Sequence, residues 1–338
     1  MDDNSGGRTP FSDIIVGAVM MLLSVLCGVA YSLILAILWK DDELMKMSSY
    51  KLMFALGVFD TVQCIPHFIT GIFTIRQSVF HPAFAKTLGV IATPAYVAYA
   101  MLTVVLAFSR FLQLYSPRLD AVLFNIKKVN YWIIFGASFW LVFVIALSTP
   151  WATIRYLPEL YSWDYDYTLK CSYWVQKCEM VIELGTIILS AFFYALVIAA
   201  LYRTRKRFLT RSNCHAEIKI LIQALVITVY CTVLNFLWHN SQLVLPDSIW
   251  SYMGLNFMWI LNSGVHPVIY FIVNRTIRER VSVRRTLPSI SKSHIFTRIP
   301  NLNNTCEPDK NKLMRTCFDG DQTLGAAMAT STKLQFVS

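Results

Sequence analysis

The stretch NSGVHPVIY, residues 262–270, lies inside a long apolar run near the C-terminal end of the chain. Proline and polar side chains are unfavourable in a helix that faces lipid, because the bilayer core contains no water to satisfy polar groups. The polar residues of this run recur every three or four positions, which places them on one face of a helix. These residues are Tyr252, Asn256, Trp259, Ser263, His266 and Tyr270. We therefore expect a membrane-spanning helix that turns its polar face towards other helices or a cavity, and turns Met258, Ile260 and Val268 towards lipid.

The whole chain has the composition of an integral membrane protein. Of its 338 residues, 56% are hydrophobic and only 15% are charged, whereas about a quarter of the residues of soluble domains are charged. The net charge of +10 does not indicate nucleic acid as a partner, because the basic residues lie between apolar runs and in the C-terminal tail. The lipid bilayer is the partner that this composition predicts.

Seven apolar runs are long enough to cross a bilayer, which takes roughly 20 residues. They lie at about 13–39, 50–75, 85–115, 130–151, 179–202, 216–238 and 249–273. We expect an all-α bundle of seven transmembrane helices over residues 13–273, preceded by a short extracellular N-terminus, residues 1–12.

The distribution of Lys and Arg predicts the orientation of this bundle, because cytoplasmic loops are enriched in both residues. With the N-terminus outside, the outer segments hold only six of the 30 basic residues. The densest short basic loop then lies inside, between the fifth and sixth runs. Its basic residues are Arg203, Arg205, Lys206, Arg207 and Arg211. We expect a multi-pass protein of the plasma membrane with a cytoplasmic C-terminus.

The chain changes character after the seventh run. Residues 274–285 combine arginines with apolar residues, and we expect a short amphipathic helix at the membrane surface. Residues 286–338 are polar and lack helical periodicity, which predicts a disordered cytoplasmic tail.

Ionisable residues inside the apolar runs are candidates for a functional site, because exposing them to lipid is expensive. Asp60 and His67 lie two helical turns apart on one face of the second run. Arg110 lies near the inner end of the third run, where it either belongs to a site or extends to the interface. The alternative for each residue is a structural hydrogen bond between helices.

Two cysteines lie near each other in the sequence between the fourth and fifth runs. Cys171 and Cys178 could form a disulfide if their segment is extracellular, or remain free. The six histidines show no spacing typical of a metal site. We therefore expect no metal, no cofactor and no enzymatic activity.

The stretch NSGVHPVIY followed by FIVNRTIR resembles the seventh-helix signature of rhodopsin-like G-protein-coupled receptors. The residues that match are Asn262, Ser263, Pro267 and Tyr270. His266 stands where the signature usually has asparagine.

Three other spans carry further parts of the same resemblance. Asp60 in LGVFD is similar to the second-helix aspartate of these receptors, and Arg110 in SRF resembles the arginine of their third-helix motif. Trp140, with Pro150 ten residues later, resembles the fourth-helix pattern. Stretches such as YKLMFALGVFD and LNFMWILNSGVHPVIYFIVNRT look most like the T class of nematode serpentine chemoreceptors.

Several features depart from the pattern of these receptors. No cysteine begins the third span, so the usual disulfide is absent, and a Cys171–Cys178 bridge is one candidate substitute for it. Ser109 replaces the acidic residue before Arg110, and Glu217 is an alternative partner for that arginine.

The resemblance implies a receptor that binds a small molecule from outside and activates a heterotrimeric G protein inside. The implied ligand-binding residues are His67, Tyr96, Tyr99, Glu183, Asn235, His239, Tyr252, Asn256 and Trp259. The implied switch residues are Asp60, Arg110, Glu217, Asn262, His266, Pro267 and Tyr270. The implied contacts with the G protein are Arg203, Arg205, Lys206 and Arg207.

Two further expectations concern the replaced asparagine and the long outer loop. Because histidine can share a proton with a carboxylate, we predict a direct or water-mediated contact between Asp60 and His266. The aromatic and acidic loop YLPELYSWDYDY, residues 156–167, either covers the ligand pocket or forms an interfacial aromatic belt.

The alternative function is secondary transport of a small solute. Transporters are typically built from internal repeats with paired broken helices. The sequence shows no such repeat, and seven spans do not divide into equal halves. The receptor is therefore the favoured interpretation.

Overall fold

The computed structural model describes residues 8–207, 211–273, 277–278 and 280. For residues 201–225, 242 and 273 it describes no side chains. All the structural statements that follow concern these described residues.

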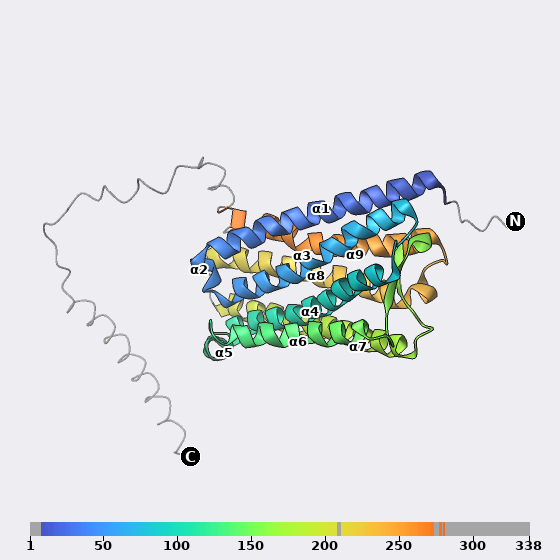
Figure 1. Cartoon of the computed structure of the whole chain (residues 1–338). Coiled ribbons are helices and arrows are strands. Elements are labelled where there is room, and N and C mark those ends of the chain that lie inside the picture. Colours follow the sequence, from blue (N-terminus) through green and yellow to red (C-terminus); the bar gives the residue numbers. More distant parts are fainter. Residues whose placement is uncertain (1–7, 208–210, 274–276, 279, 281–338) are drawn as a thin grey trace, which may run out of the picture. The chain divides into compact units, whose positions relative to one another are not determined.

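Seven long helices correspond to the seven predicted spans (Figure 1). They are α1 (Pro10–Lys40), α3 (Ser48–Arg76), α4 (Pro82–Tyr115), α6 (Val129–Ser148), α7 (Lys170–Arg207), α8 (Arg211–Val244) and α9 (Ile249–Val273). Two short helices, α2 (Asp42–Met45) and α5 (Pro117–Leu123), lie in the connections. Six of these helices are long and apolar enough over their described residues to cross a membrane. The seventh is α8, whose 34 residues also suffice in length.

The helix ends follow the local sequence. The predicted fourth span extends to residue 151, but α6 ends at Ser148 and Thr149 has an extended backbone (φ −70°, ψ 159°). Pro150 explains this difference, because a proline disfavours helical geometry in the residue before it. α7 begins nine residues before the predicted span, at Lys170. The fifth helix therefore includes a segment that the hydropathy pattern assigned to a loop.

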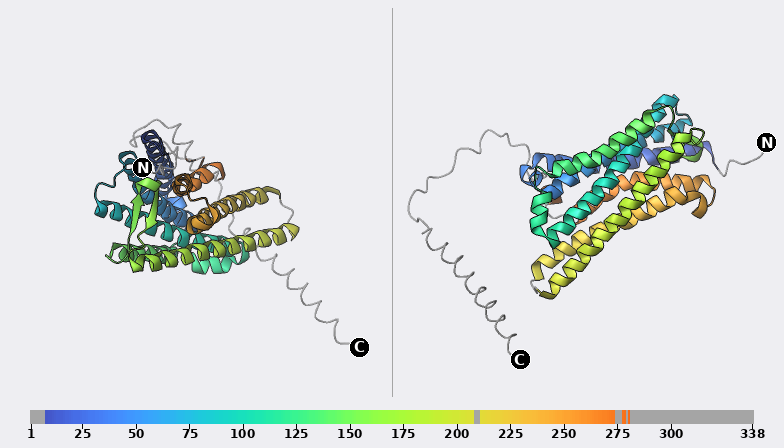
Figure 2. Two further views of the ribbon diagram at one scale, coloured as in Figure 1. Left: turned by 90° about the vertical axis from the view of Figure 1, so that its right-hand side faces the viewer. Right: turned by 90° about the horizontal axis from the view of Figure 1, so that it is seen from below.

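Neighbouring helices pack side by side along the bundle (Figures 1 and 2). α4 packs against α3, α6 and α7, and it is the most deeply buried of the six candidate spans. α1 packs against α3 and α9, while α8 packs against α7 and α9. Residues of α4 are therefore placed to contact those of the other central helices.

Two glycines allow α1 and α3 to approach closely. A Cβ atom added to Gly17 would lie 2.5 Å from the Gly71 carbonyl oxygen, and one added to Gly71 would lie 2.6 Å from the Gly17 oxygen. Because both obstacles are backbone atoms, any side chain here would separate the helices. Such contacts between small residues are a general way of packing helices in membranes.

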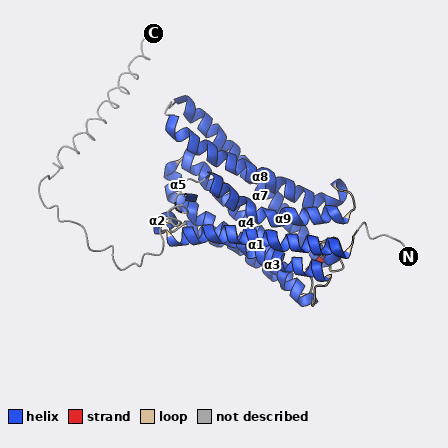
Figure 3. Cartoon of the chain, turned by 90° about the horizontal axis from the view of Figure 1, so that it is seen from above, coloured by secondary structure: helices blue, strands red, loops and turns tan. Residues whose placement is uncertain are grey.

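The segment between α6 and α7 forms a β-hairpin at the end of the bundle where α1 begins (Figure 3). β1 (Ile154–Leu157) pairs antiparallel with β2 (Ser162–Tyr165), with Ile154 opposite Tyr165 and Tyr156 opposite Trp163. The 3₁₀ turn η1 (Pro158–Leu160) joins them, and Tyr161 completes the turn with a positive φ of 53°.

The aromatic side chains of the hairpin are buried against the helices. Tyr156, Tyr161, Trp163 and Tyr165 are each at most 3% exposed. An interfacial belt would leave these rings on the surface, so the structure favours the alternative in which this segment covers the bundle. We refer to this end of the molecule as the hairpin end.

The polar face predicted for the seventh span is largely correct. Asn256, Ser263 and His266 are buried, while Val268 is 54% exposed. The prediction that Ile260 faces lipid was wrong. Ile260 is buried in a small apolar cluster with Val16 and Met20 of α1, because α1 covers that side of α9.

Candidate functional site

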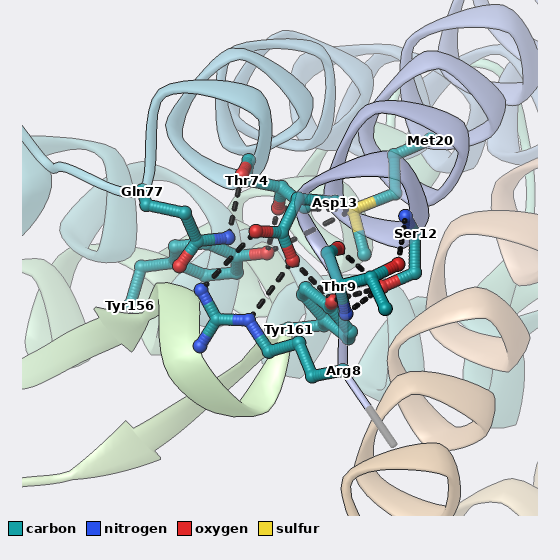
Figure 4. A network of polar contacts seen from close by, with 9 residues as sticks. All are labelled: Arg8, Thr9, Ser12, Asp13, Met20, Thr74, Gln77, Tyr156 and Tyr161. Carbon is teal, nitrogen blue, oxygen red and sulfur yellow. Dashed lines mark hydrogen bonds and ion pairs between the residues drawn. The ribbon is translucent and has the colours of Figure 1, made fainter. Parts of the chain in front are cut away.

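A network of polar contacts fastens the hairpin to α1 and α3 (Figure 4). Asp13 of α1 accepts a hydrogen bond from the Tyr161 hydroxyl and forms an ion pair with Arg8, whose Nε lies 2.9 Å from its Oδ1. The Tyr156 hydroxyl lies 2.6 Å from Thr74 Oγ1 of α3. We call this network the hairpin clamp.

Two further contacts connect the hairpin to α9 and α7. Asn256 Nδ2 donates to the Tyr161 carbonyl oxygen at 2.9 Å, and the Tyr165 hydroxyl donates to the Glu179 carboxylate. The hairpin is thus fixed by side chains from four helices, which makes it a rigid cover.

Two acidic side chains at the end of the hairpin have opposite electrostatic environments. Burial raises the pKa of Asp164 above its usual range. The hydrogen bond from the Thr168 side chain lowers the pKa of Asp166, which also pairs with Arg155 at 3.5 Å. Asp164 therefore opposes folding when it ionises, whereas Asp166 supports it.

A wide cavity of about 610 Å³, the vestibule, opens beside the hairpin. The hairpin, the start of α7, the end of α8 and the start of α9 line it, and His239 and Tyr252 are among its residues. α8 departs from helical geometry at Asn240 (φ −124°, ψ 19°), directly after His239. This break shapes one wall of the vestibule.

A small cavity of about 20 Å³, the chamber, adjoins the vestibule. Ile154, Tyr165 and Trp238 line both cavities, so the two spaces meet at these side chains. The complete lining of the chamber is Thr93, Tyr96, Ile154, Tyr165, Glu179, Glu183, Leu234, Asn235, Trp238 and Trp259. A space of this volume holds about one water-sized group.

An acidic cluster forms one side of the chamber. Glu179 and Glu183 lie one turn apart on α7, and both are at most 5% exposed. Glu183 Oε2 lies 3.0 Å from His239 Nε2 of α8. Its other carboxylate oxygen, Oε1, is buried and has no hydrogen-bond partner in the part of the chain that the structure describes.

Aromatic rings form the opposite side of the chamber. Trp259 of α9 packs edge-on against Trp238 of α8, with ring centroids 5.2 Å apart, and against Tyr96 of α4 at 6.3 Å. The Tyr96 hydroxyl donates to Asn235 Oδ1 at 3.3 Å. Trp259 Nε1 donates to Gln63 Oε1 of α3 at 3.0 Å. The chamber therefore combines carboxyl groups with aromatic surface.

A chain of side-chain contacts continues from the chamber towards the middle of the bundle. The Tyr96 and Tyr99 rings lie one turn apart on α4, with centroids separated by 5.6 Å. The Tyr99 hydroxyl lies 2.7 Å from His266 Nε2, and His266 Nδ1 lies 3.1 Å from the Tyr270 hydroxyl. Because a neutral imidazole has one donor and one acceptor nitrogen, His266 can satisfy both tyrosines at once.

The direct contact predicted between Asp60 and His266 is not formed. Tyr99 and Tyr270 occupy both ring nitrogens of His266. Asp60 is fully buried, and neither of its carboxylate oxygens has a hydrogen-bond partner within bonding distance among the described residues. The Tyr31 hydroxyl lies beside the carboxylate.

Three more predicted residues are buried close to this centre. His67 is fully buried behind Trp259, with its ring edge-on at 4.9 Å and both nitrogens unpartnered. Asn262 Oδ1 accepts a weak contact from the Cys231 thiol at 3.6 Å, and Pro267 lies inside α9. These groups share the interior with Asp60, although they do not line the chamber.

Arg110 is only loosely held at the end of the bundle opposite the hairpin. Its Nη1 lies 3.4 Å from Gln113 Oε1, and Gln113 in turn donates to Ser49 Oγ at 3.0 Å. Burial raises the pKa of Asp120, while the nearby Arg110 guanidinium opposes that rise. The side chains of Glu217, Arg203, Arg205, Lys206 and Arg207 lie outside the described part of the structure.

The residues predicted to bind ligand do not all line one cavity. Tyr96, Glu183, Asn235 and Trp259 line the chamber, whereas His239 and Tyr252 line the vestibule. Tyr99 lines a further small cavity below the chamber. Asn256 lines neither chamber nor vestibule, because it binds the hairpin backbone.

The sequence interpretation missed several residues of the chamber. Glu179 was not singled out, although its spacing of four from Glu183 places the two carboxylates on one helix face. Thr93 and Tyr165 gave no such signal, because only the folding of the hairpin onto α4 brings them together.

Of the two alternatives for Cys171 and Cys178, the structure shows the free thiols and not the disulfide. Both cysteines are free and exposed, and both lie in the first turns of α7. Seven helical residues separate their backbones by about 10 Å, which exceeds the reach of a disulfide. Among the described residues, no group of three or more His, Cys, Asp or Glu is arranged to hold a metal ion.

Comparison with known proteins agrees with this architecture. Residues 4–294 match the family described as Serpentine type 7TM GPCR chemoreceptor Srt. The crystal structure of squid rhodopsin superimposes with a TM-score of 0.66 and 16% sequence identity, covering 84% of this chain and 89% of the rhodopsin chain. At that identity the likeness shows a shared fold alone, and no curated protein matches the chain.

The family match covers most of the chain, including all seven long helices. It describes multi-pass membrane receptors and not enzymes or transporters. This chain therefore belongs to the Srt family of serpentine seven-transmembrane G-protein-coupled chemoreceptors.

Proposed function

We propose that this receptor binds a small molecule at the hairpin end and activates a heterotrimeric G protein at the opposite end. In this proposal the N-terminus and the hairpin face the outside of the cell, and the protein lies in the plasma membrane. Residues 13–273 form the bundle in this proposal. The predicted surface helix, residues 274–285, lies mostly outside the described residues, and the predicted tail, residues 286–338, lies wholly outside them.

The observation that best supports this function is the line of contacts from the chamber to the middle of the bundle. Tyr96 lines the chamber and packs on Tyr99, which contacts His266. His266 in turn contacts Tyr270, four residues further along α9. A ligand that shifts Tyr96 thereby changes the packing of groups on both α4 and α9.

Agonism requires that a ligand bind the active arrangement of the helices better than the resting one. The hairpin is fixed to four helices, so the cover itself has little freedom to respond. The contacts of Arg110 are long and few. We therefore assign the movable part to the inner ends of the helices, where Arg110, Glu217 and Tyr270 would exchange partners and the basic residues 203–207 would meet the G protein.

The test is nucleotide exchange on purified G proteins by the full-length receptor in lipid nanodiscs. Heterotrimers from each Gα class are screened against a library of small volatile and polar molecules. We expect His266→Phe to reduce agonist-stimulated exchange by about tenfold, because it leaves the Tyr99 and Tyr270 hydroxyls buried without their partner. Arg110→Ala should abolish exchange, whereas Arg118→Ala, which changes an exposed arginine of α5, should not.

Two outcomes would contradict the proposal. Exchange that survives both His266→Phe and Arg110→Ala would show that this line of contacts carries no coupling. Signalling through a G protein would be contradicted if no heterotrimer responds to a receptor whose thermal denaturation curve shows that it is folded.

A further inference from the structure

One carboxyl oxygen of the chamber has no hydrogen-bond partner among the described residues. Glu183 is 2% exposed, and its Oε1 atom has no hydrogen-bond partner. The Thr93 hydroxyl, on the facing helix α4, is also buried without a partner and lines the same cavity. A buried polar group without a partner is unfavourable, so both atoms are available to a ligand.

The chamber has more acidic than basic side chains. Glu179 already receives the Tyr165 hydroxyl, and His239 faces the Oε2 atom of Glu183. With both carboxylates ionised, the site holds two negative charges against at most one positive charge on the imidazole. A cation is therefore the occupant that the charges favour.

The aromatic rings favour an organic cation. Tyr96, Trp238 and Trp259 all line the chamber, and aromatic faces attract ammonium groups. A metal ion fits less well, because the described residues contain no group of three or more ligands arranged for one.

The size of the two cavities restricts the ligand further. At about 20 Å³ the chamber holds one water-sized group, which suits a primary ammonium and excludes a trimethylammonium. The vestibule is about 610 Å³ and shares Ile154, Tyr165 and Trp238 with the chamber. An attached apolar tail can therefore extend from one cavity into the other.

We propose that this receptor recognises primary amines, with the ammonium group in the chamber against Glu183 and Thr93 and the organic tail in the vestibule. The proposal rests on the proposed receptor function for its biological meaning. The binding site itself stands on the cavity, the unpartnered carboxylate oxygen and the surrounding rings.

The experiment measures ligand binding to the full-length receptor in lipid nanodiscs, without a G protein. The probe is n-butylammonium, and the readout is the concentration dependence of the melting temperature. Butan-1-ol and butyrate replace the cation by neutral and anionic groups on the same tail. Butyltrimethylammonium keeps the charge but enlarges the head.

Butylammonium should stabilise the wild type, and the other three probes should not. Glu183→Gln should weaken butylammonium by about 30-fold or more, since it removes the buried counter-ion. Glu179→Gln should weaken it less, because the Tyr165 hydroxyl already engages that carboxylate. The matched control is Glu159→Gln, which neutralises an exposed glutamate of the hairpin turn outside both cavities.

Equal binding of butylammonium to the wild type and Glu183→Gln would overturn the proposal, as would binding of butan-1-ol or butyltrimethylammonium with equal strength. The comparison of the four probes on the wild type needs no variant, so it decides the question even if Glu183→Gln fails to fold. If the receptor stimulates nucleotide exchange on a G protein but does not bind amines, the amine proposal is wrong and the proposed receptor function stands. Amine binding without exchange would instead contradict the proposed signalling function.

Discussion

Buried polar groups are hydrogen-bonded in the hairpin clamp, but several lack partners at the centre of the bundle that the structure describes. In the clamp, Asp13 engages both Arg8 and Tyr161, and Tyr156 engages Thr74 (Figure 4). At the centre, Asp60 and His67 are fully buried, yet their polar side-chain atoms have no partner in the described structure. Satisfied networks fix one structure, whereas unsatisfied groups keep alternatives open. We therefore expect the clamp to keep one arrangement and the groups at the centre to exchange partners.

The largest expected effect is the loss of the clamp. Asp13→Ala removes the partner of both Arg8 and the buried Tyr161 hydroxyl, so the free energy of unfolding should fall by about 3 kcal/mol. The melting temperature of the purified receptor measures this loss, and limited proteolysis shows whether the hairpin detaches.

Asp42→Ala is the matched control, because it removes an exposed acidic residue at the start of α2. If Asp13→Ala and this control have equal melting temperatures, the clamp does not contribute to stability and the prediction is wrong.

A smaller effect of opposite sign is expected at the centre. Asp60→Asn replaces an unpartnered buried carboxyl by a neutral group of the same size, so the free energy of unfolding should rise by about 1–2 kcal/mol. The melting temperature is again the measurement, with Asp42→Asn as the exposed control. A decrease would mean that Asp60 has a stabilising partner, and the contrast between the two regions would disappear.

The smallest effect concerns the two acids at the end of the hairpin. The folded-state pKa of Asp164 is raised, so the free energy of unfolding falls as pH rises from the unfolded pKa through the folded one. Asp164→Asn should therefore raise the melting temperature at pH 7 by about 1–2 °C, and the gain should vanish below about pH 4.

Asp166 provides the control with the reverse sign. Its folded-state pKa is lowered, so its contribution to stability is present above the unfolded pKa and is lost as pH falls through the folded one. Asp166→Asn should lower the melting temperature at pH 7. The same pH dependence in both variants would show that burial does not govern Asp164.

The sequence predicted the helices well because a helix that crosses a bilayer needs a run of roughly 20 mainly apolar residues. Six of the seven predicted spans lie within an observed helix, and the run 249–273 coincides with α9 (Ile249–Val273). The spacing of polar residues also predicted which face of α9 is buried. Ile260 was misplaced because periodicity reports one polar face, but cannot report that α1 covers an apolar one.

Hydropathy, the spacing of polar residues and the family motifs were thus enough to predict a membrane-spanning helix bundle with a buried polar face. Which of the buried residues contact one another followed from the packing of the folded chain. It joined His266 to Tyr99 and Tyr270 instead of Asp60, left Cys171 and Cys178 free, and folded the hairpin over the bundle to complete the chamber. The physical reason is that hydropathy depends on each residue and its near neighbours, whereas a contact between helices depends on packing between segments distant in the chain.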